Sequence, residues 1–294
     1  MQDRTSVKFI WVMILNFIIT IAEFLGGIFS GSLALLSDAL HNLGDTGAIV
    51  LSFFAHLISK KNKDQIKTFG YERAETLAAF TNGVALVIIS FFLIIEAIGR
   101  FFKPEPIKGN IMLVVAIIGL IANIISMAAM HNDSKDNLNV KSTFIHMLSD
   151  ALSSIVVVIG AIFIKIWHWE WLDPTLTILV SIFILYEAFK IIKNAADVLM
   201  ESNPSIDLDQ VKEIMLTVPE ITNVHHVHLW KYSDQLTMLD AHVNVQSNLE
   251  TAELETIYNK LEQKLSSLGI NHITLQAECT RGLKEDMIEN NKND

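Results

Sequence analysis

The chain has 294 residues, of which 51% are hydrophobic and 18% charged, and its mean hydropathy of +0.40 excludes an ordinary soluble domain and indicates a membrane protein. The net charge of −10 lies mostly in the last third, and no basic face with interleaved aromatic residues occurs, so nucleic acid is excluded as a partner. Its single cysteine, Cys279, excludes an intrachain disulfide and a cysteine-based metal cluster.

Six apolar stretches predict transmembrane helices, because about 18–20 apolar residues suffice to cross a bilayer. These predicted spans cover residues 7–29, 33–58, 74–101, 111–130, 142–166 and 172–192. The first exceeds the core of a cleavable signal peptide, so we expect it to be retained. Glu23 interrupts this span, and its carboxylate either lines an access path to a site or snorkels to the interface.

A His and an Asp stand four residues apart in the second span, at His41 and Asp45, and again in the fifth, at His146 and Asp150. On a helix this spacing places both side chains on one face. An ionised carboxylate is costly in hydrocarbon and needs a partner, and two imidazoles with two carboxylates form a neutral tetrahedral set around a dication. The set favours Zn²⁺ and excludes Ca²⁺. The alternative is that these residues only pack and cap helices, which requires the pattern to arise twice without a shared purpose.

Asp38 is a competing partner for Asp150, because residues 36–40 and 148–152 are identical pentapeptides. We favour Asp45, since only the His-x-x-x-Asp spacing occurs in both spans. Asp38 then lies at the outer mouth of the site or supports its ligands.

Other polar residues in the spans favour structural roles. Glu96 and Arg100 are spaced to form a salt bridge, and Asn123 is typical of interhelical hydrogen bonding. Of the Lys and Arg residues up to Lys193, eleven lie on the side of the amino terminus and four on the other. The positive-inside rule therefore predicts a multi-pass protein of the cell membrane with both termini in the cytoplasm.

The composition changes after residue 203. The pattern predicts a helix at 207–217, strands at 223–230 and 236–246, a helix at 250–268 and a strand at 272–278. We therefore predict a membrane domain over residues 1–200, a cytoplasmic α+β domain of αββαβ order over 201–280, and a disordered tail over 281–294.

With these elements the chain resembles the cation diffusion facilitators, the proton-coupled zinc exporters. The resemblance covers residues 7–278 and includes two further motifs: Phe-Gly-Tyr-Glu-Arg-Ala-Glu at 69–75 and His-Val-His-Leu-Trp at 226–230. It implies that His41, Asp45, His146 and Asp150 form the central transport site. It also implies a homodimer whose cytoplasmic domains, of the ferredoxin or metallochaperone type, bind further metal.

The resemblance carries over candidate cytoplasmic ligands at His226, His242, His272 and Glu278, with His225 beside them. The alternative is that alternating histidines such as His226 simply face the surface of a half-exposed strand.

The chain departs from some bacterial relatives in the loop between the second and third spans. Those relatives build an extra metal site there from an Asp and two His; this chain keeps Asp64 but has Lys67 and Tyr71. We expect no metal site in this loop. The histidine-rich loop of many eukaryotic relatives is also absent.

The predicted function is efflux of Zn²⁺, with Cd²⁺ or Co²⁺ as further cargo, in exchange for protons at the four-ligand site. The empty carboxylate pair in a low-dielectric site takes up protons, and metal displaces them. Alternatives are a membrane-anchored metal sensor, an exporter of organic cations and an intramembrane zinc enzyme. Four protein ligands would fill the coordination shell of the zinc ion. This argues against the enzyme, because catalytic zinc keeps one coordination position open for water.

Overall fold

A computed structural model describes residues 2–131, 138–233, 235–247 and 249–288. Within these ranges the side chains of residues 2–10, 130, 131, 138–143 and 146 are not described. The chain forms two compact units, one of residues 1–57 and 78–192 and the other of residues 58–77 and 193–294. Each unit is described by itself.

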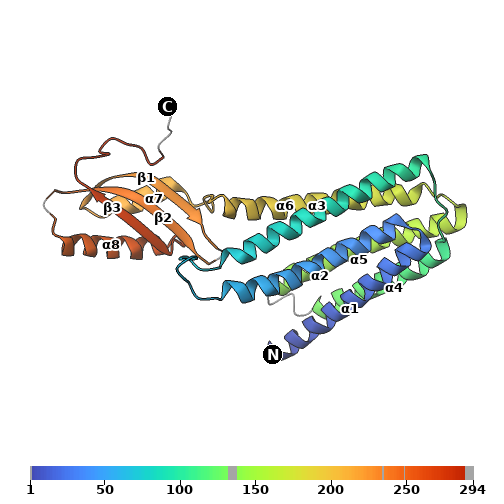
Figure 1. Cartoon of the computed structure of the whole chain (residues 1–294). Helices are drawn as coiled ribbons and strands as arrows, with labels where there is room; N and C mark the ends of the chain where they lie inside the picture. Colours follow the sequence, from blue (N-terminus) through green and yellow to red (C-terminus); the bar gives the residue numbers. More distant parts are fainter. Residues whose placement is uncertain (1, 132–137, 234, 248, 289–294) are drawn as a thin grey trace. The chain divides into compact units, whose positions relative to one another are not determined.

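Six long helices supply the first unit and extend beyond it (Figure 1). They are α1 (Gln2–Ser30), α2 (Leu33–Ser59), α3 (Arg73–Phe102), α4 (Gly109–His131), α5 (Leu138–Trp167) and α6 (Leu172–Leu199). Five of them, all but α2, are long and apolar enough to cross a membrane. In α2 the residues Asp38, His41, Asn42 and Asp45 lower the hydropathy, so the described helices confirm five candidate spans rather than the six predicted.

Small side chains bring α2, α4, α5 and α6 together. Their shared buried cluster consists of Ala34, Leu35, Met112, Ala116, Val157, Ala161, Ile164 and Leu176. Alanine lets helix backbones approach closely, and close packing is the main attraction between helices in lipid. A second cluster joins α3 to α6 through Leu86, Ile184 and Ala188.

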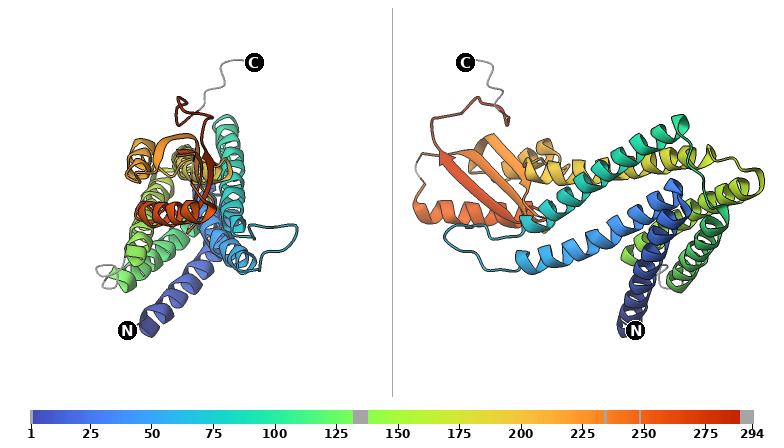
Figure 2. Two further views of the ribbon diagram at one scale, coloured as in Figure 1. Left: turned by 90° about the vertical axis from the view of Figure 1, so that its left-hand side faces the viewer. Right: turned by 45° about the vertical axis from the view of Figure 1, so that its right-hand side comes forward.

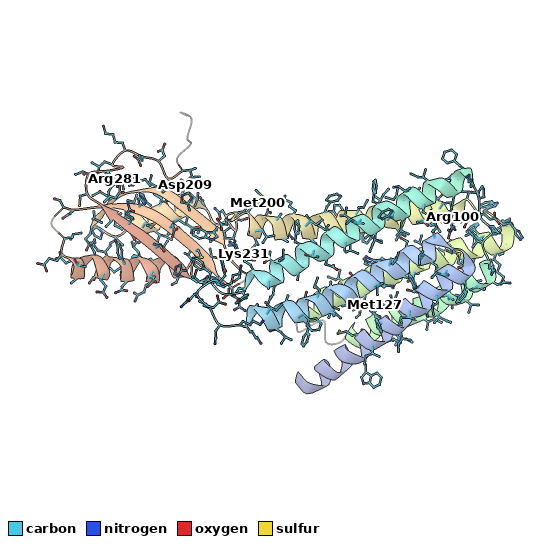
Figure 3. All side chains as sticks on the ribbon, in the orientation of Figure 1. Arg100, Met127, Met200, Asp209, Lys231 and Arg281 are labelled. Atoms are coloured by element: carbon cyan, nitrogen blue, oxygen red, sulfur yellow. The ribbon has the colours of Figure 1, made fainter. Side chains whose placement is uncertain are left out.

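The start of α2 is held by a buried carboxylate from α6. Asp173, which is fully buried, accepts hydrogen bonds from Ser32 Oγ (2.5 Å), Leu33 N (2.8 Å) and Ala34 N (3.2 Å). These backbone amides are among the first N–H groups of α2, which have no partner inside the helix. Arg100, labelled in Figure 3, donates to the carbonyl of Gly31 at the same turn. The start of α2, the helix that carries His41 and Asp45, is thereby held against α3 and α6.

Two predicted polar contacts are present in this unit. Arg100 Nε lies 3.8 Å from Glu96 Oε1, which confirms the predicted ion pair. Asn123 Nδ2 donates to Ser154 Oγ at 3.0 Å and joins α4 to α5, as expected of an amide between helices.

The second unit contains a three-stranded sheet with two helices (Figure 2). Its elements are α7 (Leu208–Leu216), β1 (Ile221–Lys231), β2 (Thr237–Val245), α8 (Thr251–Ser266) and β3 (His272–Glu278), which is the predicted αββαβ order. Strand β1 pairs with β2 antiparallel, and β2 with β3 parallel. Asp207 caps α7 by accepting from the amide of Asp209, and Glu250 with Glu253 forms a capping box at α8.

Helices α7 and α8 share one hydrophobic core with the three strands of the sheet. Val211 and Met215 of α7 and Leu261 of α8 are fully buried in it. Met287 also belongs to this core and is 8% exposed. The sequence predicts a disordered tail from residue 281, whereas Met287 holds residues 281–288 against the sheet; residues 289–294 lie outside the described residues.

The motif at residues 69–75 packs inside this second unit. Arg73 Nη2 lies 3.1 Å from Glu201 Oε1, and its guanidinium stands 4.6 Å above the ring centre of Tyr232. The ring of Phe69 also contacts Tyr232, with 5.4 Å between the ring centres. An ion pair backed by a cation–π contact joins the motif to the loop after α6 and the end of β1.

Candidate metal sites

Helices α2 and α5 bring together three of the four residues predicted for the transport site. His41, Asp45 and Asp150 each offer a ligand atom, and these atoms lie within 4.8 Å of one another. His41 Nε2 is 3.6 Å from Asp45 Oδ2 and 3.7 Å from Asp150 Oδ1. One imidazole nitrogen therefore stands between carboxylates from two helices.

These separations fit a small dication. In a tetrahedral zinc site with ligands at about 2.0 Å, neighbouring ligand atoms are about 3.3 Å apart, and the two distances from His41 Nε2 lie within a few tenths of an ångström of that edge. The side chain of His146 lies outside the described residues, but α5 is helical through both His146 and Asp150. The spacing of four that placed these residues on one face therefore applies.

Asp38 lies apart from the ligand cluster. Its carboxylate is 3% exposed and accepts hydrogen bonds from Ser153 Oγ at 2.9 Å and Ser154 Oγ at 3.4 Å, both on α5. Asp38 therefore ties α2 to α5 one turn from the site. This geometry supports Asp45 as the partner of His41.

Glu23 does not snorkel to the interface. It is 1% exposed, and its Oε2 accepts a hydrogen bond of 3.0 Å from Asn42 Nδ2, next to His41 in the chain. Its other oxygen lies against Gly119 of α4, where a Cβ atom would stand 2.0 Å from it. The absence of a side chain at Gly119 makes room for this buried carboxylate.

A second cluster lies on the sheet of the other unit. His225, His242 and Glu278 offer ligand atoms within 4.8 Å of one another. Glu278 Oε2 is 3.3 Å from His225 Nε2, and Glu278 Oε1 is 3.3 Å from His242 Nδ1. The two distances run to different oxygens, so the carboxylate of Glu278 stands between the two imidazoles.

A bulge in β1 decides which histidines belong to this cluster. The pairing register with β2 shifts between His225 and His228, and His226 has a positive φ of 50°. The buried ring of His225 thereby joins the cluster, while His226 stacks on His242 with 4.7 Å between ring centres. His226 and His228 also lie close, with their Nε2 atoms 3.4 Å apart.

His272 lies far from this cluster. It pairs with Met238 at the start of β3, whereas Glu278 ends the strand, six residues or about 20 Å away. The structure therefore separates His272 from the ligands with which the sequence grouped it, and places the buried His225 among them instead.

The electrostatics of the second cluster favour metal binding. Burial, with the nearby charges of His226 and Arg281, lowers the pKa of His242 below its ordinary value. Burial works against ionisation of Glu278, but the hydrogen bond from Gln276 and the charge of Arg281 outweigh it and lower the pKa of that carboxyl. A neutral imidazole and an ionised carboxylate are the forms that bind metal.

In the loop between α2 and α3, hydrogen bonds occupy the carboxylate of Asp64. It accepts from Tyr71 Oη (2.6 Å), Ile66 N (2.8 Å) and Lys67 N (2.7 Å). The bond from Tyr71, followed by the two backbone bonds, lowers the pKa of Asp64. Tyr71, which stands where some bacterial relatives have a metal-binding histidine, thus stabilises a turn of this loop through its bond to Asp64.

With both clusters in place, the sequence was compared with known proteins. A family profile described as "Cation efflux transmembrane domain" matches residues 9–200, and one described as "Cation efflux protein, cytoplasmic domain" matches residues 203–279. The chain belongs to the cation diffusion facilitator family. Members of this family are transporters and not enzymes, and the second profile identifies the sheet unit as the family's cytoplasmic domain.

Relatives align with this facilitator over most of their length. The "Cadmium, cobalt and zinc/H(+)-K(+) antiporter" of Bacillus subtilis is 37% identical over 274 residues, 91% of this chain and 88% of the relative. The "Zinc transporter ZitB" of Escherichia coli is 38% identical over 88% of this chain and 82% of the relative. The "Metal cation efflux system protein CzcD" of Cupriavidus metallidurans is 35% identical over the same shares.

The hydroxyl of Tyr71 should control the ionisation of Asp64. We expect Tyr71→Phe to raise the pKa of Asp64 towards its ordinary value of about 3.9. Because the folded pKa is lowered, this carboxylate stabilises the loop above the unfolded pKa, and that contribution is lost as pH falls through the folded value. Carbon-13 NMR titration of labelled aspartate measures the change, with Tyr186→Phe as a control on an exposed tyrosine; an unchanged Asp64 titration would contradict the assignment.

The cytoplasmic cluster should depend on His225 and not on His272. In the full chain carrying Asp150→Ala, which removes a transport-site ligand, we expect His225→Ala to lower the tightly bound zinc by one ion per chain. His272→Ala should leave the zinc content unchanged. Elemental analysis after gel filtration measures it, and equal losses in both variants would show that the cluster is not the binding site.

Proposed function

We propose that this facilitator exports a divalent metal cation, Zn²⁺ in the first place, in exchange for protons. The observation that carries the proposal is the ligand cluster of His41, Asp45 and Asp150, built from two long helices of the transmembrane domain. The names of relatives in three bacteria, which include zinc transport and antiport with H⁺, support the same cargo and counter-ion.

The donor set accounts for the choice of metal. With His146 as the fourth ligand, two neutral imidazoles and two carboxylates cancel the charge of a dication within the membrane. Nitrogen ligands in a four-coordinate site favour Zn²⁺, Co²⁺ and Cd²⁺ over Mg²⁺ and Ca²⁺, which prefer six or more oxygen ligands.

The same residues account for the exchange. When metal leaves, Asp45 and Asp150 remain together in a low-dielectric site, where two negative charges repel each other and lack water. Protons neutralise them, and His41 offers a further nitrogen that binds either a proton or a metal ion. Alternate opening of the site to the two sides then couples export of metal to entry of protons down their gradient.

The topology completes the proposal. We infer six spans, with α2 as the sixth. An even number of spans puts both termini on the same side of the membrane, and the excess of Lys and Arg on that side supports the cytoplasm. The polar residues that lower the hydropathy of α2 are the proposed ligands and their neighbours, which face other helices rather than lipid. The match to the family's cytoplasmic domain supports a homodimer held in part by these domains.

The cytoplasmic domain is proposed to bind zinc at His225, His242 and Glu278. The 3.3 Å separations support this assignment. The rings of His226 and His228 lie beside this cluster, 4.9 Å apart between their centres, with His226 stacked on His242.

Transport into vesicles tests the proposal. In reconstituted vesicles with an imposed pH gradient, we expect gradient-driven zinc movement by the native chain and at least a tenfold loss in Asp150→Ala, because a buried ligand and its charge are removed. His41→Asp should shift the preference towards metals that favour oxygen ligands.

Asp197→Asn, which removes an acid on α6 outside both clusters, serves as the matched control and should transport normally. If no divalent metal moves through the native chain while its cytoplasmic domain still binds zinc, the protein is a membrane-anchored sensor. If Asp150→Ala transports as well as the native chain, the four-ligand site is wrong.

A further inference from the structure

The segment after β3, residues 281–288, lies on the sheet beyond the end of the matched family domain. Four hydrogen bonds from the sheet hold its backbone. Asn244 Nδ2 donates to Arg281 O (2.6 Å), Asn223 Nδ2 donates to Gly282 O (2.9 Å) and Glu285 O (3.3 Å), and Val227 N donates to Met287 O (2.7 Å). Met287 is the apolar anchor in the core. We call residues 281–288 the tail segment.

The tail segment crosses the cytoplasmic metal cluster. A Cβ atom on Gly282, which has a positive φ of 64°, would stand 1.9 Å from His225 Nε2. The backbone therefore passes directly over the ring nitrogen that faces Glu278, and only glycine fits there. At the other end of the tail segment, the bulge in β1 leaves Val227 without a pairing partner on β2. The amide of Val227 donates a hydrogen bond to the carbonyl of Met287 instead.

This path brings a second carboxylate to His225. Glu285 Oε2 lies 3.7 Å from His225 Nε2, the same nitrogen that is 3.3 Å from Glu278 Oε2. Glu285 stands outside the group of His225, His242 and Glu278, whose ligand atoms lie within 4.8 Å of one another, but a turn of its side chain towards His225 would give the cluster two imidazoles and two carboxylates. That set is neutral with a dication and has the four ligands that a closed zinc site requires.

We propose that Glu285 is the fourth ligand of the cytoplasmic metal site, so that metal binding fastens the tail segment to the sheet. The proposal rests on the cytoplasmic site proposed above. The side chain of Glu285 is 53% exposed and its Oε2 already lies 3.7 Å from His225 Nε2, so a change of rotamer is the movement that the proposal requires.

Arg281, labelled in Figure 3, is the charge that metal would replace. Its Nη1 lies 3.7 Å from Glu278 Oε1, and its side chain is 78% exposed. Without metal it offsets the charge of Glu278, and with metal it is free to turn into solvent.

The test compares two neighbouring acids of the tail segment, Glu285→Gln and Asp286→Asn, in the full chain carrying Asp150→Ala. Zinc affinity is measured by competition with a chromophoric chelator. We expect Glu285→Gln to weaken binding at least about tenfold, as loss of a coordinating or directly supporting group does. Asp286→Asn, which removes the same charge from an exposed side chain, should bind zinc as the parent does.

Trypsin gives a second readout, because it cleaves after Arg281 and Lys284. Zinc should slow cleavage at both positions in the parent chain and in Asp286→Asn, and should not slow it in Glu285→Gln. Equal affinity and equal protection in the two variants would overturn the role of Glu285 and leave water or a second copy of the chain as the source of the fourth ligand. Absence of zinc binding in the parent would instead overturn the cytoplasmic site itself, and the tail proposal with it.

Discussion

A carboxylate buried in a membrane must be neutralised, and the organisation of the transmembrane domain follows from that constraint. Asp150, whose side chain is 6% exposed, and Asp45, whose side chain is 31% exposed, come from two helices and meet at His41, where a cation or protons would neutralise them. Glu23 and Asp38 add two more buried carboxylates, whose hydrogen-bond donors are an amide and two hydroxyls. A site that needs positive charge, and accepts it as either a metal ion or protons, has the chemistry of an exchanger.

The rest of the unit holds this site in place. Asp173 and Arg100 hold the first turn of α2 through hydrogen bonds. Asp38, one turn before His41, joins α2 to α5 by accepting a hydrogen bond from Ser153. Alanine-rich contacts let the helices approach closely enough for side chains as short as Asp to share one ion. The polar residues that lower the hydropathy of α2 are thus the proposed ligands and the residues that contact them or their neighbours.

Local pattern predicted much of this structure. The order of elements followed from hydrophobic periodicity, and the spacing of four in two spans predicted a cluster to which His41, Asp45 and Asp150, which lie together, belong. Strand alternation failed at His225, because the bulge in β1 breaks the period of two and changes which ring faces the metal cluster. The distance of His272 from Glu278, the role of Asp173 and the anchoring of the tail segment by Met287 depend on tertiary contacts, which no short motif encodes.

The most direct test of the central claim is zinc X-ray absorption on the purified chain with the cytoplasmic cluster disabled by His225→Ala. A single transport site of two imidazoles and two carboxylates predicts one four-coordinate shell of nitrogen and oxygen at about 2.0 Å, with the multiple scattering of two imidazole rings. A six-coordinate oxygen shell without imidazole scattering would contradict the account.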